Sequence, residues 1–175
     1  MRFLNPKEAI GILKLAYGQR VVDLGAGSGH YVFEAARAVG EAGIVYALDI
    51  QNELVRHVAK EARLRRLANV EAMVGDLERE HGSGLPDNCA DAVIISNTLF
   101  QIGQKQILIK EAVRVLKNGA KLLIIDWKES YKGLGPQPEQ IVRASEIKKI
   151  AEELGCTLLE EIDPGAHHFG LLFKK

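Results

Sequence analysis

The feature that most constrains this chain is a short apolar run that breaks into alternating glycines. The run Val21–Leu24 is rich in β-branched residues and predicts a buried strand. Gly25, Gly27 and Gly29 follow it, and a helical pattern of apolar residues begins at Tyr31. A strand that enters a helix through such a turn brings backbone close to a ligand and points free N–H groups at it. The sequence therefore predicts a binding site at this turn.

The residues around the glycines indicate which kind of ligand the turn suits. A dinucleotide fingerprint requires a glycine at the position that His30 occupies here. Asp23 ends the strand, and its carboxylate would repel a pyrophosphate but attract an ammonium group. The alternative is a tight turn that needs only small residues, and it does not account for the acid. The pattern therefore favours a nucleoside that carries an amino acid over a dinucleotide.

The glycine-rich segment also resembles a known motif. Asp23-Leu24-Gly25-Ala26-Gly27-Ser28-Gly29 is similar to motif I of the class I methyltransferases that depend on S-adenosylmethionine (SAM). The resemblance implies a Rossmann-like three-layer α/β/α sandwich, with a seven-stranded, mostly parallel sheet whose last strand is antiparallel. It also implies that SAM lies across the carboxyl ends of the strands and leaves as S-adenosylhomocysteine. The resemblance extends from about Arg20 to Phe173.

Two further acids stand at the ends of predicted strands. Asp49 closes the strand predicted over 44–49, about twenty residues after the glycines, where a carboxylate accepts hydrogen bonds from ribose hydroxyls. Asp76 follows the strand predicted over 69–74, where the resemblance places the adenine. With Asp23 they offer one ligand an ammonium partner, a ribose partner and a base partner. The predicted cofactor residues are Asp23, Gly25, Ala26, Gly27, Gly29, Asp49, Ile50, Gly75, Asp76, Leu77 and Asn97.

The rest of the chain predicts alternating helices and strands. Helices are expected over 5–17, 31–39, 53–67, 104–116 and 146–154, with Asn5, Asn52 and Ser145 as N-caps. Gly119 is expected to end the fourth helix in a left-handed conformation. Further strands are expected over 89–96, 121–126, 156–162 and 166–173. The turn 163–165 would join the last two strands in a hairpin, so the final strand is antiparallel.

Composition and charge are those of one globular domain over residues 1–175, with residues 1–19 as an N-terminal helical segment. The 23 basic and 23 acidic residues balance, so nothing draws the chain to nucleic acid or an anionic membrane. Cys89 and Cys156 have no metal-ligand spacing and fit a reducing compartment, and no metal site is predicted. No apolar run approaches the roughly 20 residues of a membrane span. We therefore expect a cytoplasmic protein, and a homodimer remains open.

The methyl acceptor is expected at the irregular stretch 127–144, because long loops in compact domains usually carry function. Trp127 and Tyr131 would line a pocket there, and Arg143 would hold an anionic group. The alternative is an ordinary connection. The strand end at 96–100 has none of the prolines that mark methyltransferases acting on amines of bases or on glutamine amides. It resembles small-molecule methyltransferases, among them the ubiquinone/menaquinone-biosynthesis type.

Methyl transfer from a sulfonium needs mainly alignment of the reacting atoms and exclusion of water. A general base is required only if the nucleophile starts protonated. The candidates by residue type and expected placement are His30, Asp126, His167 and His168. The sequence does not require any of them to act as the base. His167 and His168 are neighbours on a predicted strand and would point to opposite faces. The alternative for these two is a hairpin position without a catalytic role.

Three other functions remain open at this stage. One is an RNA or protein methyltransferase, which the neutral charge and the missing prolines disfavour. Another is a non-catalytic module of the same fold that binds a partner. The third, a nicotinamide oxidoreductase, is disfavoured by Asp23 and His30. The basic residues of the helix predicted over 53–67 are interpreted as a solvated face rather than as an RNA-binding surface.

Overall fold

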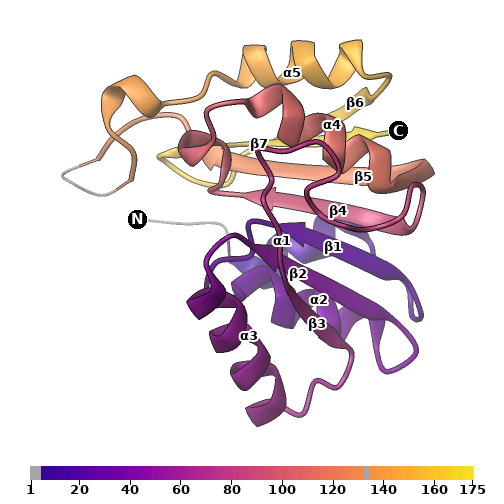
Figure 1. The fold of residues 1–175 in the computed structure, drawn as a ribbon. Coiled ribbons are helices and arrows are strands. Elements are labelled where there is room, and N and C mark those ends of the chain that lie inside the picture. Colours follow the sequence, from indigo (N-terminus) through magenta and orange to yellow (C-terminus); the bar gives the residue numbers. More distant parts are fainter. Residues whose placement is uncertain (1–4, 132–134) are drawn as a thin grey trace.

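The computed structural model describes residues 5–131 and 135–175. Its strands are β1 (Arg20–Leu24), β2 (Ile44–Asp49), β3 (Val70–Val74), β4 (Ala90–Ser96), β5 (Leu116–Trp127), β6 (Thr157–Ile162) and β7 (His168–Lys174). They form one seven-stranded sheet in the order β3-β2-β1-β4-β5-β7-β6 (Figure 1). Adjacent strands from β3 to β5 are parallel, and β7 runs antiparallel to both β5 and β6. The predicted sheet and its antiparallel last strand are confirmed.

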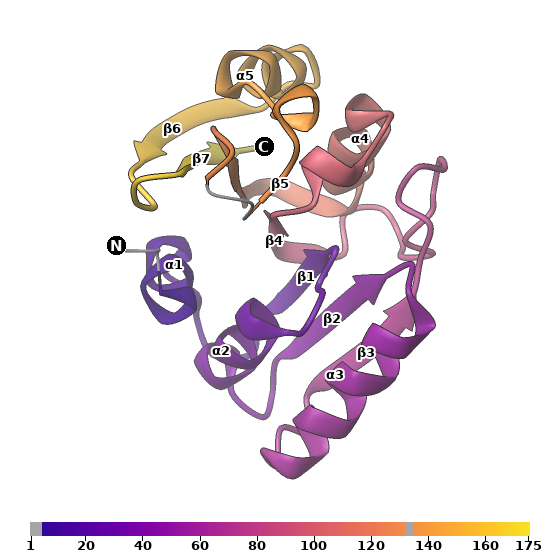
Figure 2. The same cartoon turned by 90° about the vertical axis from the view of Figure 1, so that its left-hand side faces the viewer.

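Helices cover both faces of this sheet. The helices α1 (Pro6–Leu13), α2 (His30–Val39) and α3 (Asn52–Leu64) lie on one face. The helices α4 (Lys105–Val115) and α5 (Ala144–Glu153) lie on the other (Figure 2). Side chains alternate between the two faces along each strand, so β1 sends Val21 into one apolar cluster and Val22 into the other. The three layers are therefore those predicted from the sequence.

Two of the predicted helix starts are wrong. Asn5 does cap α1, because its side chain accepts the N–H of Lys7 at 2.9 Å. Gln51 and Arg143, however, are the N-caps of α3 and α5, and neither makes a side-chain capping bond. Asn52 and Ser145 therefore lie inside the helices, because α3 begins one residue and α5 two residues earlier than predicted.

Two helix ends also differ from the prediction. The helix α1 stops at Leu13 rather than Tyr17, because Lys14 adopts a left-handed conformation with φ 51°. Gly119 does not end α4, which stops at Val115. It lies instead in β5 with φ 81°, and its N–H donates to the carbonyl of Lys175 at 2.7 Å. The glycine is needed where the strand bends to meet the end of the chain.

The carboxyl edge of the sheet gathers the ends of β1 to β5 with the beginning of β7. Ser96 at the end of β4 is level with Ile125 in β5, and Trp127 pairs with His168. His167 lies in the turn before β7 and not in the strand, so the prediction that both histidines belong to the strand is wrong. Residues 1–4 of the predicted N-terminal segment and 132–134 of the predicted loop lie outside the described residues.

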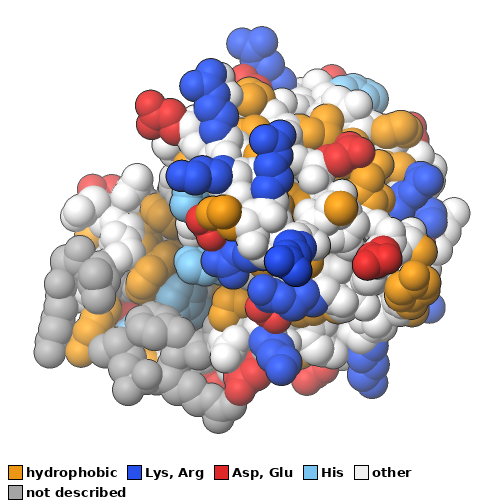
Figure 3. All heavy atoms as spheres, turned by 90° about the horizontal axis from the view of Figure 1, so that it is seen from below, with side chains coloured by type: hydrophobic (Ala, Val, Ile, Leu, Met, Phe, Trp, Pro, Cys, Tyr) orange, Lys and Arg blue, Asp and Glu red, His pale blue; other side chains and the backbone are white. Residues whose placement is uncertain are grey.

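The face opposite α4 and α5 carries many basic side chains. Figure 3 looks at the molecule from below, where α2 and α3 lie in Figure 1, and shows Lys and Arg side chains among fewer acidic ones. Part of this charge is neutralised locally, because Arg65 pairs with Glu61 at 3.1 Å and stacks over the ring of Phe33. Within the described ranges, no helix is long and apolar enough to cross a membrane.

Candidate functional site

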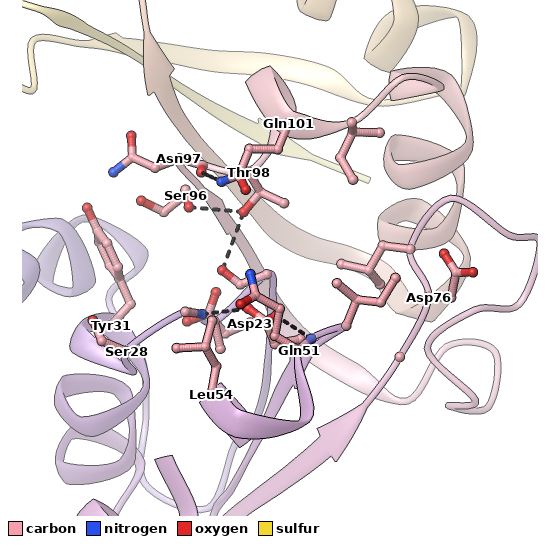
Figure 4. A pocket seen from close by; sticks show the side chains of 18 of the residues that line it. Asp23, Ser28, Tyr31, Gln51, Leu54, Asp76, Ser96, Asn97, Thr98 and Gln101 are labelled. Carbon is pink, nitrogen blue, oxygen red and sulfur yellow. Dashed lines mark hydrogen bonds between the residues drawn. The ribbon is translucent and has the colours of Figure 1, made fainter. Parts of the chain in front are cut away.

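A cavity of about 350 Å³ opens at the carboxyl ends of β1, β2, β3 and β4 (Figure 4). Its size suits a small ligand. The glycine turn, the strand ends and the segment after β4 supply the walls. Every predicted cofactor residue except Gly29 lines it: Asp23, Gly25, Ala26, Gly27, Asp49, Ile50, Gly75, Asp76, Leu77 and Asn97. The structure thus brings together residues that lie up to 74 positions apart in the chain.

The three glycines of the turn have different structural roles. Gly25 has φ +85°, and a Cβ there would lie 2.2 Å from Oγ1 of Thr98. Gly27 has φ +53°, and a Cβ there would meet nothing within 4 Å, so its surface is open toward the cavity. Gly29 precedes α2, and a Cβ there would lie 2.8 Å from the ring of Phe33. Gly29 therefore allows close packing of α2 and does not line the cavity.

Asp23 lies at the bottom of the cavity and is only 1% exposed. Burial, with a smaller contribution from the charge of Asp49, raises the pKa of Asp23 from 3.8 to about 7. Its Oδ1 atom is buried and has no hydrogen-bond partner among the described residues. A buried carboxylate oxygen without a donor is costly. The site is therefore built for a ligand that brings one, preferably with a positive charge.

Asn97 provides a second acceptor of the same kind. It follows β4 with φ 53°, a left-handed conformation that Asn tolerates better than most residues. Its N–H donates to the carbonyl of Ile125 at 2.9 Å, which fixes the backbone. Its Oδ1 is also buried without a partner in the described part of the chain. Oγ of Ser96 is the third buried polar atom without a partner among the described residues, and all three residues line the cavity, which suits a ligand that brings several hydrogen-bond donors.

Asp49 is held in place by backbone groups on both of its oxygens. Oδ2 accepts the N–H of Gly27 at 3.0 Å, and Oδ1 accepts the N–H of Gln51 at 2.9 Å. The first of these bonds ties the end of β2 to the glycine turn of β1. Each carboxylate oxygen retains a further lone pair, so Asp49 can also accept bonds from vicinal hydroxyl groups.

Asp76 lies at the other end of the cavity from Tyr31 in Figure 4. Its Oδ2 pairs with Nε of Arg79 at 2.8 Å, and its Oδ1 accepts the N–H of Glu78 at 3.2 Å. Arg79 is 80% exposed, so this ion pair is weak and can yield to a ligand. Because the strands run in the order β3-β2-β1, Asp49 lies between Asp76 and Asp23 along the edge.

Several residues of the cavity were not predicted as cofactor residues. Tyr31 belongs to the first turn of α2, and burial raises the pKa of its hydroxyl. Figure 4 shows it beside Ser96 and Asn97, at the end of the cavity that faces β5. Its position directly after the glycine turn was a signal that could have identified it. The others are Ser28, His30, Gln51, Leu54, Glu78, Ser96, Thr98, Gln101 and Ile102.

Two of the four candidate bases have clear locations relative to the cavity. His30 is exposed and lines it. Asp126 is fully buried and is not among the lining residues. Its oxygens accept the N–H groups of Leu99 and Trp127, both at 2.8 Å, while burial raises its pKa to about 6. Asp126 therefore holds the 3₁₀ turn η1 (Leu99–Gln101), which forms part of the cavity wall.

The other two candidates lie in a second group of side chains beside the cavity, which we call the edge cluster: Trp127, Glu129, Tyr131, His167 and His168. The ring of Trp127 lies 4.1 Å from that of His168, and Tyr131 stacks on His167 at the same distance. Nδ1 of His167 lies 2.7 Å from Oε1 of Glu129. Burial, His167 and Lys128 lower the pKa of His168 to about 4.

The three predicted substrate residues do not lie together. Trp127 and Tyr131 belong to the edge cluster and do not line the cavity. Arg143 is exposed at the N-terminus of α5, where its carbonyl accepts the N–H of Glu146 at 3.0 Å. Arg143 is also not among the residues that line the cavity.

Comparison with known proteins gives matches of three kinds: a family, curated relatives and solved structures. The methyltransferase domain family matches residues 15–163. The ubiquinone/menaquinone biosynthesis C-methyltransferase UbiE of Cronobacter sakazakii is 31% identical over 113 residues, which are 64% of this chain and 44% of that protein. The chain therefore spans less than half the length of this relative.

Solved structures match over almost the whole chain. A SAM-dependent methyltransferase from Aquifex aeolicus superposes with a TM-score of 0.86 and 30% identity, covering 98% of this chain and 89% of that one. The [4+2]-cyclase SpnF superposes with a TM-score of 0.81 at 18% identity, covering 97% of this chain and 80% of that one. At that identity the likeness to SpnF concerns the fold alone.

Proposed function

Because the chain belongs to the methyltransferase domain family, as its resemblance to class I SAM-dependent methyltransferases predicted, we propose that it transfers a methyl group from SAM to a small molecule. The family implies the use of SAM, which supplies a methyl group activated by a positive sulfur. One observation carries the proposal. Three buried polar atoms without partners among the described residues, Oδ1 of Asp23, Oγ of Ser96 and Oδ1 of Asn97, belong to residues that line one cavity, and the carboxylate of Asp23 suits the ammonium group of an amino acid.

Different residues of the cavity would bind different parts of the cofactor. Asp23 and Asn97 would hold the ammonium group, and the N–H groups around the open surface of Gly27 would face the carboxylate. Asp49 would accept hydrogen bonds from the ribose hydroxyls, using the carboxylate lone pairs that do not already accept the N–H groups of Gly27 and Gln51. Asp76 and Leu77, with Ile50 beside them, would hold the adenine. The reactive end of the cofactor would then face β4 and β5.

The acceptor is proposed to be a small molecule, with the carbon of a quinol ring as the first choice. This choice rests on the similarity to UbiE, whose name describes a C-methyltransferase of ubiquinone and menaquinone biosynthesis. Because this chain covers only 44% of that protein, the acceptor is a separate proposal from the use of SAM. A cytoplasmic location and a homodimer also remain predictions from the sequence.

Other functions remain open as alternatives. A macromolecular acceptor, RNA or protein, would use the basic face around α3, but the ion pair of Arg65 with Glu61 is typical of a solvated helix. The buried acceptors favour a SAM-like ligand over a dinucleotide.

The experiment is calorimetric titration of the full chain with SAM and, separately, with NAD. We expect micromolar binding of SAM and none of NAD. Asp49→Ala should lower the affinity for SAM about 100-fold, because it removes a carboxylate that both orders the turn and accepts hydroxyl groups. Glu41→Ala, at an exposed acid, is the matched control and should bind as the wild type does. Absence of SAM binding, or binding indifferent to Asp49, would contradict the proposal.

A further inference from the structure

The charges of this chain balance in total but gather at opposite edges of the sheet. Strand β3 forms one edge, beside α3, and β6 forms the other, beside α5 (Figure 1). The segment 52–67, which is α3 and the turn after it, has five basic and two acidic residues. The segment 144–163, which covers α5 and β6, has two basic and six acidic residues. The balanced total, which predicts no attraction to an anionic surface, therefore hides a clear charge asymmetry.

Three basic side chains form a stripe along the outward side of α3. Arg56, Lys60 and Arg63 follow one another at intervals of four and three residues, so they lie on one side of the helix. All three are exposed, whereas Val58 and Ala62 of the same helix are buried. The helix dipole favours basic residues in the last turn only. It therefore does not account for Arg56 and Lys60, which lie in the second and third turns.

The stripe has no ion-pair partner among the residues that the structure describes. Arg65 differs from it, because Arg65 pairs with Glu61 and stacks over the ring of Phe33. Arg66 extends the stripe beyond the helix, since its side chain is exposed and its backbone turns at φ 58°. A helix face that is merely solvated usually carries acids three or four residues from its bases. Here Glu61 is already taken by Arg65, so the charge of the stripe stays available to a partner.

An exposed leucine lies beside these basic side chains. Leu64 ends α3, four residues after Lys60, and is 68% exposed. The exposed ring of Tyr17 lies near the same end of the helices, because it covers Gly40, whose carbonyl accepts Nδ2 of Asn69 at 2.8 Å. A leucine among basic side chains adds nothing to the binding of phosphate groups in water. It does strengthen binding to a bilayer, whose interfacial region accepts apolar groups next to the lipid headgroups.

We propose that the chain docks on an anionic lipid bilayer through a docking face that consists of Arg56, Lys60, Arg63, Leu64 and Arg66. The basic side chains would contact acidic headgroups, and Leu64 would enter the interfacial region. The acidic edge at α5 and β6 would point away from the bilayer, so the charge asymmetry would set the orientation. This inference does not rest on methyl transfer, since no residue of the docking face lines the cavity.

The shape of the docking face favours a bilayer over a nucleic acid. Figures 1 and 2 show α3 as a straight helix on the outer side of the molecule, so its exposed surface is convex. A single-stranded nucleic acid is usually bound in a groove, where its bases stack on aromatic rings. The ring of Phe33, which lies beside α3, is already covered by Arg65. A convex basic face with an exposed leucine therefore fits a lipid surface better.

The test is sedimentation of the full chain with vesicles of phosphatidylcholine that contain roughly one third phosphatidylglycerol. We expect binding at about 0.05 M NaCl, and at least about tenfold weaker partitioning at about 0.5 M NaCl or onto pure phosphatidylcholine. Each basic side chain at an anionic surface contributes about fivefold to partitioning. The triple variant Arg56→Gln, Lys60→Gln, Arg63→Gln should therefore bind the acidic vesicles about 100-fold more weakly.

A matched triple variant separates the docking face from net charge. Lys110→Gln, Lys149→Gln and Lys174→Gln remove the same charge at exposed positions of α4, α5 and β7, and should weaken partitioning less than about threefold. Both triple variants should unfold at the urea concentration of the wild type, because all six side chains are exposed. Leu64→Ser should weaken partitioning about tenfold. It should not change the binding of a single-stranded RNA of about 20 nucleotides.

Each possible result decides the matter. Absence of binding to the acidic vesicles at low salt, or equal losses in the two triple variants, would overturn docking through this face. Partitioning that does not respond to Leu64→Ser would overturn its entry into the interfacial region. Tighter binding to RNA than to the vesicles, lost in the first triple variant, would assign the face to a nucleic acid. Self-association without vesicles, measured by analytical ultracentrifugation and lost in the same variant, would assign it to the acidic edge of a second copy.

Discussion

Two halves of the carboxyl edge are built in different ways: the proposed cofactor half, at β1, β2 and β3, and the proposed acceptor half, which is the edge cluster at β5 and β7. In the cofactor half, backbone N–H groups hold Asp49, and the glycine turn shapes the cavity. In the acceptor half, side chains hold side chains: His167 with Glu129 and Tyr131, and His168 with Trp127. The first half depends on backbone conformation, whereas the second depends on contacts between distant segments.

This difference shows which part of the molecule can change its specificity. A site fixed by strand ends and a glycine turn tolerates few substitutions, because the backbone itself forms the cavity. A site made of side chains on irregular segments can be altered without disturbing the sheet. We therefore expect substitutions in the cofactor half to affect folding and SAM binding together, and substitutions in the acceptor half to leave both nearly unchanged.

The largest expected effect concerns Asp23 and pH. Between pH 3.8 and about 7 the folded chain keeps the proton of Asp23, whereas the unfolded chain loses it. The contribution of Asp23 to the free energy of unfolding therefore falls as pH rises through this range. The variant Asp23→Asn has no carboxyl group at this position, so its unfolding free energy does not fall with pH for this reason. The difference in unfolding free energy, variant minus wild type, should grow by at most about 4 kcal/mol from pH 4 to pH 8, as measured by urea denaturation without SAM.

The same substitution should have the opposite effect on binding. Asn cannot offer a negative charge to the ammonium group, so Asp23→Asn should lower the affinity for SAM about 100-fold. In the wild type, affinity should rise as pH rises through about 7, because binding requires the ionised carboxylate. Calorimetry over this pH range checks both statements. If Asp23→Asn is less stable than the wild type at every pH and still binds SAM normally, Asp23 does not bind the cofactor.

Gly25 and Gly27 both have positive φ but differ in the space around them, so their alanine variants can be compared for stability. Gly25→Ala should lower the free energy of unfolding by about 3 kcal/mol, because its Cβ would overlap Thr98 and its φ is +85°. Gly27→Ala meets no atom and should cost only about 1 kcal/mol for its left-handed backbone. Denaturant unfolding of both variants measures the difference. Equal costs would mean that Thr98 does not pack against the turn as the structure has it.

Asp126 lies between the two halves, and its effect should be intermediate. Asp126→Asn replaces one acceptor with an amide donor, so one of the N–H groups of Leu99 and Trp127 loses its bond. The unfolding free energy should fall by about 2 kcal/mol. The affinity for SAM should fall only severalfold, because η1 forms one wall of the cavity. A complete loss of SAM binding in a folded variant would show a direct contact instead.

The smallest effects on SAM binding are expected away from the cavity, at Trp127 of the acceptor half and at Arg143 of α5. Trp127→Phe and Arg143→Ala should change the affinity for SAM less than about twofold, since neither residue lines the cavity. Calorimetry checks this result, and Asp49→Ala serves as the positive control in the same experiment. A strong loss of SAM affinity in either variant would break the division into two halves.

The sequence predicts the cofactor half because its information is local. Asp23, Asp49 and Asp76 each follow an apolar strand, and parallel strands bring such positions to one edge. Gly29 is the exception in that half. Spacing alone groups it with Gly25 and Gly27, but only packing shows that it makes room for Phe33.

The acceptor half could not be predicted to the same extent. Glu129 and His167 are 38 residues apart, and no sequence pattern around either residue predicts their contact. Their contact depends on the antiparallel pairing of β5 with β7, which brings Trp127 level with His168. Arg143, chosen for its charge, lies at the start of α5 outside the cavity lining. Side-chain clusters formed by long-range pairing require the structure.

The most direct measurement is a crystal structure of the full chain with S-adenosylhomocysteine bound. We predict that its ammonium group lies within hydrogen-bond distance of Oδ1 of Asp23 and Oδ1 of Asn97, that its ribose hydroxyls contact Asp49, and that its sulfur faces the edge cluster. A ligand with its amino acid at Asp76, or a ligand outside the cavity, would contradict the account of how this sheet edge is divided.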